Sequence, residues 1–475
     1  MSPNVALLLW VVLLFLLLRY DPGRESAISW AIWLPLCWFF FSQTRLPSQW
    51  LGKTTGSVAT ALNEGNAFDR PFLFGLIILA VFILVRRSFR WGQFLGQNFF
   101  LTAFLLFGLI SFLWSDFASI ALKRWIRDLG NYFAILVVLT DPNPLPAVRT
   151  FFRRLYFILI PLSYMMIKYY TFDAIRYDGW TGLPEYVGAA TSKNTLGATC
   201  MLSGIFFFWD VLARWSERKE TQTKLIILLN IVFFVMSFYV LRLSNSATSL
   251  ACLLLGCGVI LAYHFWRQHP VFIKTLIPVF LCSVILAYAF GLNEFVARSF
   301  GRDPSLTGRT QIWESLLMFD SNWLLGTGYE SFWLGERLYQ VWVATGFVTQ
   351  AHNGYLEVYL NLGLVGLCIL VFLLLSSYRR ICKSFTHSAV LAPLVLASWT
   401  LALFYNITEA AFKAPFMCLT FLVGALIIPG QRQQEPQPLL RAKILPQAGR
   451  PRVVPKWAGV NRLRIQGKSD HGQTY

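Results

Sequence analysis

One histidine in this sequence stands where it could act as a base. His352 directly precedes Asn353, a residue type that often caps the start of a helix, and a long apolar run follows. The positive end of a helix dipole disfavours the imidazolium form, so the ring stays neutral and can accept a proton. The alternative is a histidine that only caps a helix at the membrane interface.

The residues after His352 follow helical spacing. His352, Leu356, Tyr359, Gly363 and Gly366 fall on one face of the predicted helix. Because glycine carries no side chain, we expect another membrane helix to pack closely against this face.

The composition indicates an integral membrane protein. Of the 475 residues, 56% are hydrophobic and 13% charged, and the mean hydropathy is +0.54. Apolar runs recur that are long enough to cross a bilayer as helices and lack the alternation of barrel strands. The net charge of +18 does not indicate nucleic-acid binding, because Lys and Arg lie between these runs and in a tail. The 8 cysteines include no CxxC pair, which argues against a disulfide framework and a zinc site.

The apolar runs predict an all-α, polytopic integral membrane protein with about 12 to 13 transmembrane helices. The first run lacks the basic start and the small-residue cleavage site of a signal peptide, so we count it as a span. The runs form one domain, 1–429, which a tail at 430–475 follows. The candidate spans are 5–18, 26–41, 71–85, 94–113, 125–140, 151–169, 194–213, 224–243, 246–266, 271–291, 354–376, 388–406 and 411–429.

Basic residues orient the spans. Four short loops rich in Lys and Arg fall on one side when the spans alternate, which identifies that side as cytoplasmic. They lie around 86–90, 149–154, 214–224 and 379–383. The tail lies there too; it carries nine Lys or Arg against two acidic residues, a net charge of +7, and we expect it to be disordered against the anionic leaflet. The loop 292–351 then faces outward, and we expect an amphipathic helix at 308–319 after a Thr307 cap.

Cations on the outer side could hold an anionic ligand. Lys123, Arg124 and Arg127 lie at an outer helix end, against the usual charge bias. Their side chains either snorkel to lipid headgroups or hold an anion there. Among the five histidines, His352 is the one predicted on this side.

These groups suit glycosyl transfer to a hydroxyl. The acceptor hydroxyl needs a base, and a neutral histidine serves near neutral pH. If the donor is a polyprenyl diphosphate, arginine can hold the anionic leaving group by two-point contact without a metal. The outer segments contain no DxD-type cluster, so we expect neither a metal nor another cofactor.

Several stretches resemble the O-antigen ligase and polymerase superfamily. The strongest are GRTQIWESLLMFDSNWLLGTGYESF at 308–332 and HNGYLEVYLNLGLVG at 352–366. Upstream, EGNAFDRP, LWSDFASIALKRWIRDLG and TSKNTLG look most like the exopolysaccharide-production polymerase branch. The resemblance covers roughly residues 60–430 and separates ligase from polymerase poorly.

The resemblance implies that a glycan moves from undecaprenyl diphosphate to an acceptor hydroxyl at the periplasmic face of the bacterial inner membrane. His352 matches the base of the family, with Asn353 beside it, and Arg309 matches a loop arginine that contacts diphosphate. A second family arginine follows a serine in a turn between two spans. Here that position is Asn245, so Arg242 is the candidate replacement.

Three further residues are candidates for binding the diphosphate or the glycan. Lys193 and Asn194 match a Lys-Asn element of the branch, and Arg124 belongs to the outer cation group described above.

The expected partners are the bilayer, the undecaprenyl-diphosphate-linked glycan and an acceptor. A growing glycan as acceptor would make the protein a polymerase, and a lipid A core would make it a ligase. Polysaccharide export or chain-length proteins are further candidate partners. The alternatives are a flippase for lipid-linked glycans, which should show internal repeats and charges along a central cavity, and a non-catalytic assembly scaffold.

Overall fold

The computed structural model describes residues 1–21, 28–53, 66–177, 182–215, 220–266, 309–319, 321–384 and 390–429, together with residue 218 and a few positions between 268 and 279. The tail at 430–475, most of the predicted span at 271–291 and the Thr307 cap lie outside the described residues.

The described residues are mostly helical. They contain one small antiparallel sheet, β1 (Ile175–Tyr177) with β2 (Pro184–Tyr186). The helices before this sheet are α1 (Pro3–Arg19), η2 (Trp30–Ile32), α2 (Trp33–Gln43), α3 (Pro47–Trp50), α5 (Asp69–Arg86), α6 (Trp91–Gln97), α7 (Phe99–Ile110), η3 (Ser111–Leu113), α8 (Ala118–Leu139), α9 (Pro144–Tyr169) and α10 (Thr171–Ala174). Those after it are α11 (Lys193–Arg214), α12 (Thr221–Ser244), α13 (Ala247–Trp266), α16 (Arg309–Leu317), α17 (Gly335–Thr345), α18 (Gly354–Ser384), α19 (Ala392–Thr408), α20 (Ala414–Met417), η5 (Cys418–Leu422) and α21 (Val423–Ala425).

The polytopic all-α class is confirmed. Within the described ranges, five helices are long and apolar enough to cross a membrane, or six if α5 and α6, bent by 100°, form one span. The five are α9, α11, α12, α13 and α18. The predicted spans that fall on described residues coincide with these and with shorter or more polar helices, so the number of 12 to 13 spans stays a prediction.

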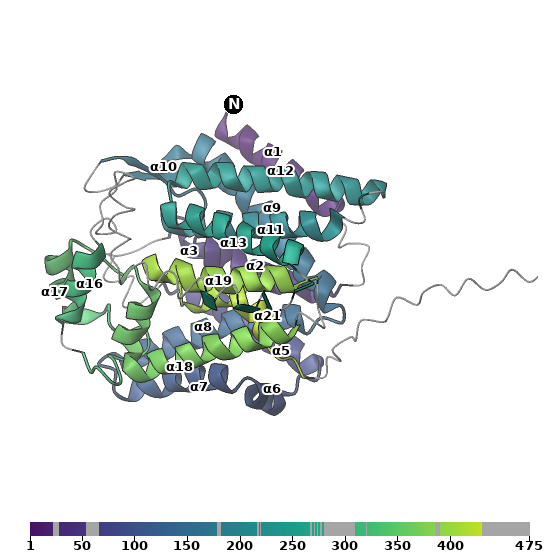
Figure 1. The fold of residues 1–475 in the computed structure, drawn as a ribbon. Helices are drawn as coiled ribbons and strands as arrows, with labels where there is room; N and C mark the ends of the chain where they lie inside the picture. The colour runs from purple at the N-terminus through teal and green to yellow at the C-terminus, as the bar shows by residue number, and fades with distance from the viewer. Residues whose placement is uncertain are drawn as a thin grey trace, which may run out of the picture. The chain divides into compact units, whose positions relative to one another are not determined.

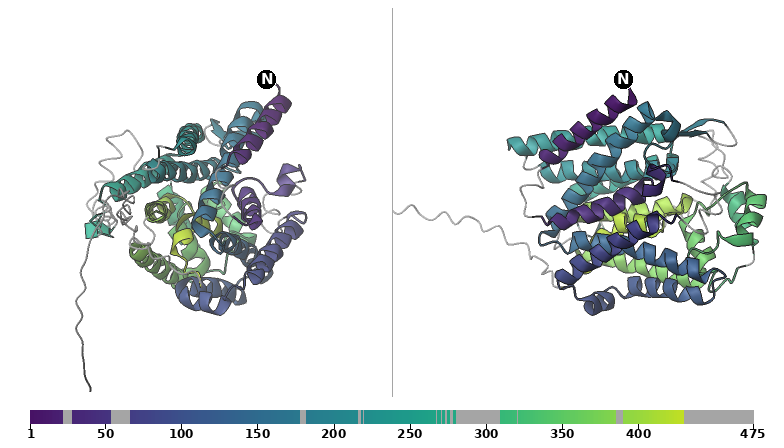
Figure 2. Two further views of the ribbon diagram at one scale, coloured as in Figure 1. Left: turned by 90° about the vertical axis from the view of Figure 1, so that its right-hand side faces the viewer. Right: turned by 180° about the vertical axis from the view of Figure 1, so that it is seen from behind.

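Two helices form the centre of the bundle. In the most apolar stretch of each helix, 83% of α9 and 72% of α11 is buried inside the protein. The corresponding share is 39% for both α12 and α13. α11 packs against α9, α12 and α13, and α13 packs against α19, as Figures 1 and 2 show. The exposed apolar side chains of α12 would contact lipid in a bilayer.

Helix α18 is interrupted at Gly363. Its φ of 62° and ψ of −166° are not helical, and a Cβ there would lie 2.3 Å from the Leu324 carbonyl group. Loop backbone, and not the helix we expected, therefore approaches this glycine. The loop pairs with the interrupted helix as a strand would, because Leu364 N–H donates to the Trp323 carbonyl and Gly328 N–H to the Asn361 carbonyl. The prediction of a second membrane helix against Gly363 was wrong.

The last predicted span, 411–429, is not one regular helix. It consists of α20, a π-helical turn and α21, with a non-helical backbone at Thr420. Pro415 at the start of α20 lacks an N–H, which suits the first turn of a helix but not its interior. The chain between α19 and α20 therefore stays irregular, and this is where the site described below lies.

Helices α16 and α17 lie side by side at one end of α18 and α19 (Figures 1 and 2). A small second core of Leu316, Phe332, Leu338 and Leu360 joins them to the first part of α18. α16 coincides with the amphipathic helix expected at 308–319, and on it Leu316 is buried whereas Leu317 is 57% exposed.

Candidate active site

The backbone around His352 is held in an uncommon conformation. Asn353 caps α18 as expected, since its Oδ1 accepts hydrogen bonds from the backbone N–H of Tyr355 and Leu356, at 3.0 and 3.1 Å. His352 precedes this cap with a φ of 49°, in the left-handed region that few residues other than glycine adopt. Such strain persists only where the surroundings enforce it, and it concentrates at functional sites.

Glu357 enforces this conformation from the first turn of α18. Its buried carboxylate accepts the backbone N–H of Ala351 at 2.9 Å and the indole N–H of Trp333 at 2.7 Å. The Ala351 carbonyl in turn accepts the indole N–H of Trp313 from α16, at 2.9 Å. The residue before His352 is thus tied to α16, to the loop that carries Trp333 and to α18.

Glu409 brings three of the candidate residues together. This residue ends α19 and is 4% exposed. Its Oε1 accepts a hydrogen bond from Nη2 of Arg309 at 2.9 Å, and its Oε2 accepts one from Nδ2 of Asn194 at 3.1 Å. Nδ1 of His352 lies 3.5 Å from the same Oε2. Arg309 also donates to the backbone carbonyl of Thr408.

The Glu409 cluster places a histidine that can act as a base beside a carboxylate whose charge an arginine balances. A buried carboxylate is costly unless it is paired, and Arg309 provides the pairing. With Nδ1–H turned to Glu409, the Nε2 atom of His352 is left to accept a proton, as in other carboxylate-oriented histidines. The His352 side chain remains 25% exposed, so a substrate hydroxyl can reach it.

The other predicted residues lie elsewhere. Lys193 forms an ion pair with Glu185 of β2, although it begins the same helix as Asn194. Arg242 is exposed at the end of α12 and makes no ion pair with any described residue. Asn245, where the resemblance expects an arginine, ends α12 in the left-handed conformation, with a φ of 53°, which asparagine tolerates well.

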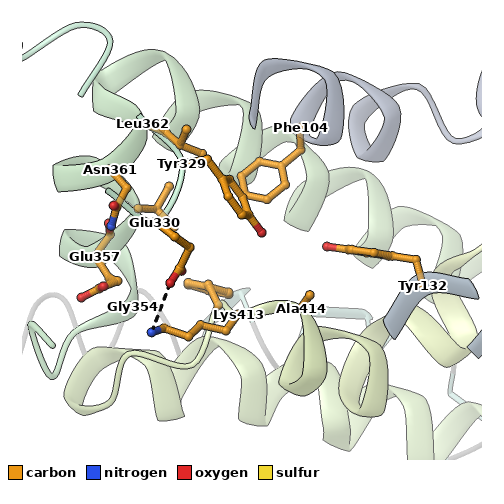
Figure 3. Close-up of a pocket in the computed structure, with 12 residues that line it drawn as sticks. Phe104, Tyr132, Tyr329, Glu330, Gly354, Glu357, Asn361, Leu362, Lys413 and Ala414 are labelled. Atoms are coloured by element: carbon orange, nitrogen blue, oxygen red, sulfur yellow. Dashed lines mark hydrogen bonds and ion pairs between the residues drawn. The ribbon is translucent and has the colours of Figure 1, made fainter. Parts of the chain in front are cut away.

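Arg124 belongs to a second charged cluster. Its guanidinium donates to the backbone carbonyl of Glu330. The Glu330 carboxylate pairs with the Lys413 ammonium at 3.6 Å, and both residues line a cavity of about 30 Å³ (Figure 3). Burial alone would raise the pKa of the Glu330 carboxyl, but the charges of Lys413 and Arg124 outweigh it and lower this pKa. The cavity has room for about one or two water molecules but not for a sugar.

A larger pocket of about 220 Å³ borders the Glu409 cluster. Asn194, Gln350, Glu409 and Lys413 are among its lining residues. Sequence reasoning missed Glu409, Gln350 and Lys413. Glu409 did carry a signal, because it is the only acidic residue between Glu357 and Glu435 and lies between two apolar runs, where a charge is costly and often functional.

Comparison with known proteins indicates the same family as the sequence motifs. Residues 231–371 match the O-antigen ligase family, a range that includes Arg309 and His352 but ends before Glu409. The chain is also 26% identical, over 289 residues, to the exopolysaccharide production protein ExoQ of Rhizobium meliloti (strain 1021). This similarity covers 58% of the chain and 63% of that protein. One segment of the chain is therefore similar to the O-antigen ligase family, and a longer stretch is similar to an exopolysaccharide production protein, in agreement with the resemblance of the sequence motifs.

Proposed function

We propose that the protein is a membrane glycosyltransferase that moves a glycan from undecaprenyl diphosphate to an acceptor hydroxyl, as a polymerase or a ligase. The match to the O-antigen ligase family and the similarity to an exopolysaccharide production protein support the class of reaction. The observation that carries the proposal is the Glu409 carboxylate, which contacts both a histidine suited to be the base and an arginine suited to bind diphosphate.

In the proposed reaction His352 takes the proton of the acceptor hydroxyl on Nε2. The acceptor oxygen forms a bond to the anomeric carbon of the donor sugar, and the bond from that carbon to the diphosphate oxygen breaks. The electron pair leaves with the diphosphate, whose charge Arg309 stabilises. A guanidinium has five N–H donors, so Arg309 can keep its contacts with Glu409 and Thr408 and still donate to the diphosphate.

The setting of this reaction is part of the proposal. The site would face the periplasm from the bacterial inner membrane, and the acceptor would be a growing glycan or a lipid A core. Arginine and histidine supply the charge and the base, so we expect the transfer to need no metal ion.

The test is glycan transfer by the purified protein from an undecaprenyl-diphosphate donor with a chelator present. We expect His352→Gln to insert normally and to lose about 10²–10⁴-fold in turnover, because glutamine can hydrogen-bond the acceptor but cannot take its proton. His264→Gln, at an exposed position of α13, is the matched control and should retain full turnover. Near-normal turnover in His352→Gln would remove the base from the mechanism. Loss of transfer in the presence of the chelator would show that the reaction needs a metal ion.

A further inference from the structure

The pocket beside Glu409 is lined by groups suited to a sugar. It lies between α2, α11, α19 and the segment that leads into η5. Ser192 at its rim is exposed, while Gln43 and Thr199 are buried. Its polar side chains are mainly neutral amides and hydroxyls, such as Gln43, Ser42, Asn194, Thr195 and Gln350.

The Gln43 side chain is buried, at 7% exposure, and lacks a full set of hydrogen-bond partners among the described residues. Its Oε1 lies 3.0 Å from the hydroxyl oxygen of Thr199, and its Nε2 has no hydrogen-bond partner within the described part of the chain. The Thr199 hydroxyl also lies 3.0 Å from the Thr195 carbonyl, and one proton cannot serve both acceptors. Whichever way the carboxamide is turned, at least one of its two polar atoms remains without a partner among the described residues.

A ligand hydroxyl satisfies this demand in either orientation, because it can both donate and accept. A buried amide without a partner is costly, so its retention at the pocket suggests that a ligand completes it. The volume of about 220 Å³ far exceeds the need of one water and is below the roughly 300–1,000 Å³ of pockets for drug-sized ligands. One sugar ring fits these limits better than an oligosaccharide does.

The pocket adjoins the proposed base. Glu409 and Gln350 both line it, and each lies 3.5 Å from Nδ1 of His352. A carboxylate in the wall accepts hydrogen bonds from sugar hydroxyls, and the Lys413 ammonium in the same wall is already paired with Glu330. A sugar held here therefore lies next to the Glu409 carboxylate that faces His352, and the diphosphate is left to Arg309.

We propose that this pocket binds the terminal sugar ring of the acceptor, with the Gln43 carboxamide bonding one of its hydroxyls. The proposal rests on the proposed glycosyl transfer. Gln43 is assigned a role in acceptor binding and none in the chemical step.

The first experiment measures sugar binding independently of glycosyl transfer. The full-length protein in lipid nanodiscs, free of glycoside detergents, is examined by saturation-transfer NMR with a panel of methyl hexopyranosides. We expect signal from at least one glycoside with the wild type and with Gln93→Met, a control at an exposed position of α6. We expect that signal to disappear in Gln43→Met, which keeps the length of the side chain but removes its amide. Ala198→Leu, which fills the pocket without altering Gln43, should also remove it.

The second experiment reads transfer. Gln43→Met should raise the KM for the acceptor about tenfold, the effect of losing one hydrogen bond, and leave the KM for the lipid-linked donor unchanged. A purely structural role would instead lower the unfolding temperature and leave both KM values alone.

The outcomes separate the two proposals. Equal glycoside signal in Gln43→Met and the wild type, or no signal from any glycoside, would mean that the pocket holds water and would overturn the sugar site, even if transfer still depends on His352. Signal that Gln43→Met and Ala198→Leu abolish would support the sugar site, even if no transfer is found and the proposed function fails.

Discussion

The Glu409 carboxylate joins a guanidinium, an amide and an imidazole. A residue buried to this extent would be strongly destabilising as a lone charge, and the Arg309 ion pair offsets that cost. The same pair places Arg309 beside His352, so one acidic side chain sets the positions of both groups.

We predict that Glu409→Gln greatly reduces turnover. Glutamine keeps the size of the side chain but loses the negative charge that balances Arg309 and faces Nδ1 of His352. The expected fall in kcat is on the order of 10²-fold or more, by analogy with other carboxylate-oriented histidines. Initial rates at normal membrane abundance are the measurement, and Glu314→Gln, at an exposed position of α16, is the control. An unchanged kcat would reduce Glu409 to a structural residue.

We also predict that Arg309→Lys is not a conservative change. An ammonium group cannot bond Glu409 and the Thr408 carbonyl and also contact a diphosphate at two points. The catalytic efficiency toward the lipid-linked donor should fall on the order of 10²-fold. Arg337→Lys on α17, whose guanidinium bonds Asp116, should have little effect. Full activity in Arg309→Lys would limit Arg309 to its pairing with Glu409 and exclude it from diphosphate binding.

At the scale of elements, the interruption of α18 shapes the site. The break at Gly363 frees the peptide groups of residues 360–365 to bond the loop that carries Glu330 and Trp333. Trp333 then reaches Glu357, which holds the residue before His352. The positive φ and the contact with Leu324 leave no room for a side chain at this position.

Gly363→Ala should therefore destabilise the protein. The left-handed backbone costs an alanine about 1–3 kcal/mol, and the contact with the Leu324 backbone adds to this. Thermal unfolding in nanodiscs is the measurement, with a drop in midpoint and in activity expected. In Gly258→Ala on α13, the new Cβ has no atom of the described residues within 4 Å, so the change should be neutral or slightly stabilising. A Gly363→Ala midpoint equal to that of Gly258→Ala would show that the loop tolerates the change.

At the scale of the whole molecule, orientation in the membrane is the main prediction. Basic loops at 214–224 and 379–383 predict a cytoplasmic side, which places His352 and Arg309 on the other. A reporter enzyme that works only after export, fused at about residue 330, should be active, while the same reporter fused at the C-terminus should be inactive. Activity of the C-terminal fusion alone would reverse the orientation and move the site to the cytoplasm.

The sequence by itself determined the α-helical membrane class, the approximate positions of most helices and the cap at Asn353. These depend on apolar runs and on neighbours a few residues apart, which are local properties. The roles of Lys193, Arg242 and Arg124 could not be separated in this way, because a cation at a helix end looks the same whether it pairs with protein, lipid or ligand.

Only the tertiary structure decided which groups meet. Glu409 lies 100 residues from Arg309 and 215 from Asn194 along the chain, and no periodicity links them. Burial of apolar surface is non-directional, so it selects which segments are buried but not which partners they face. The break at Gly363 and the burial of the Gln43 amide likewise depend on backbone and side chains that are brought together from distant parts of the chain.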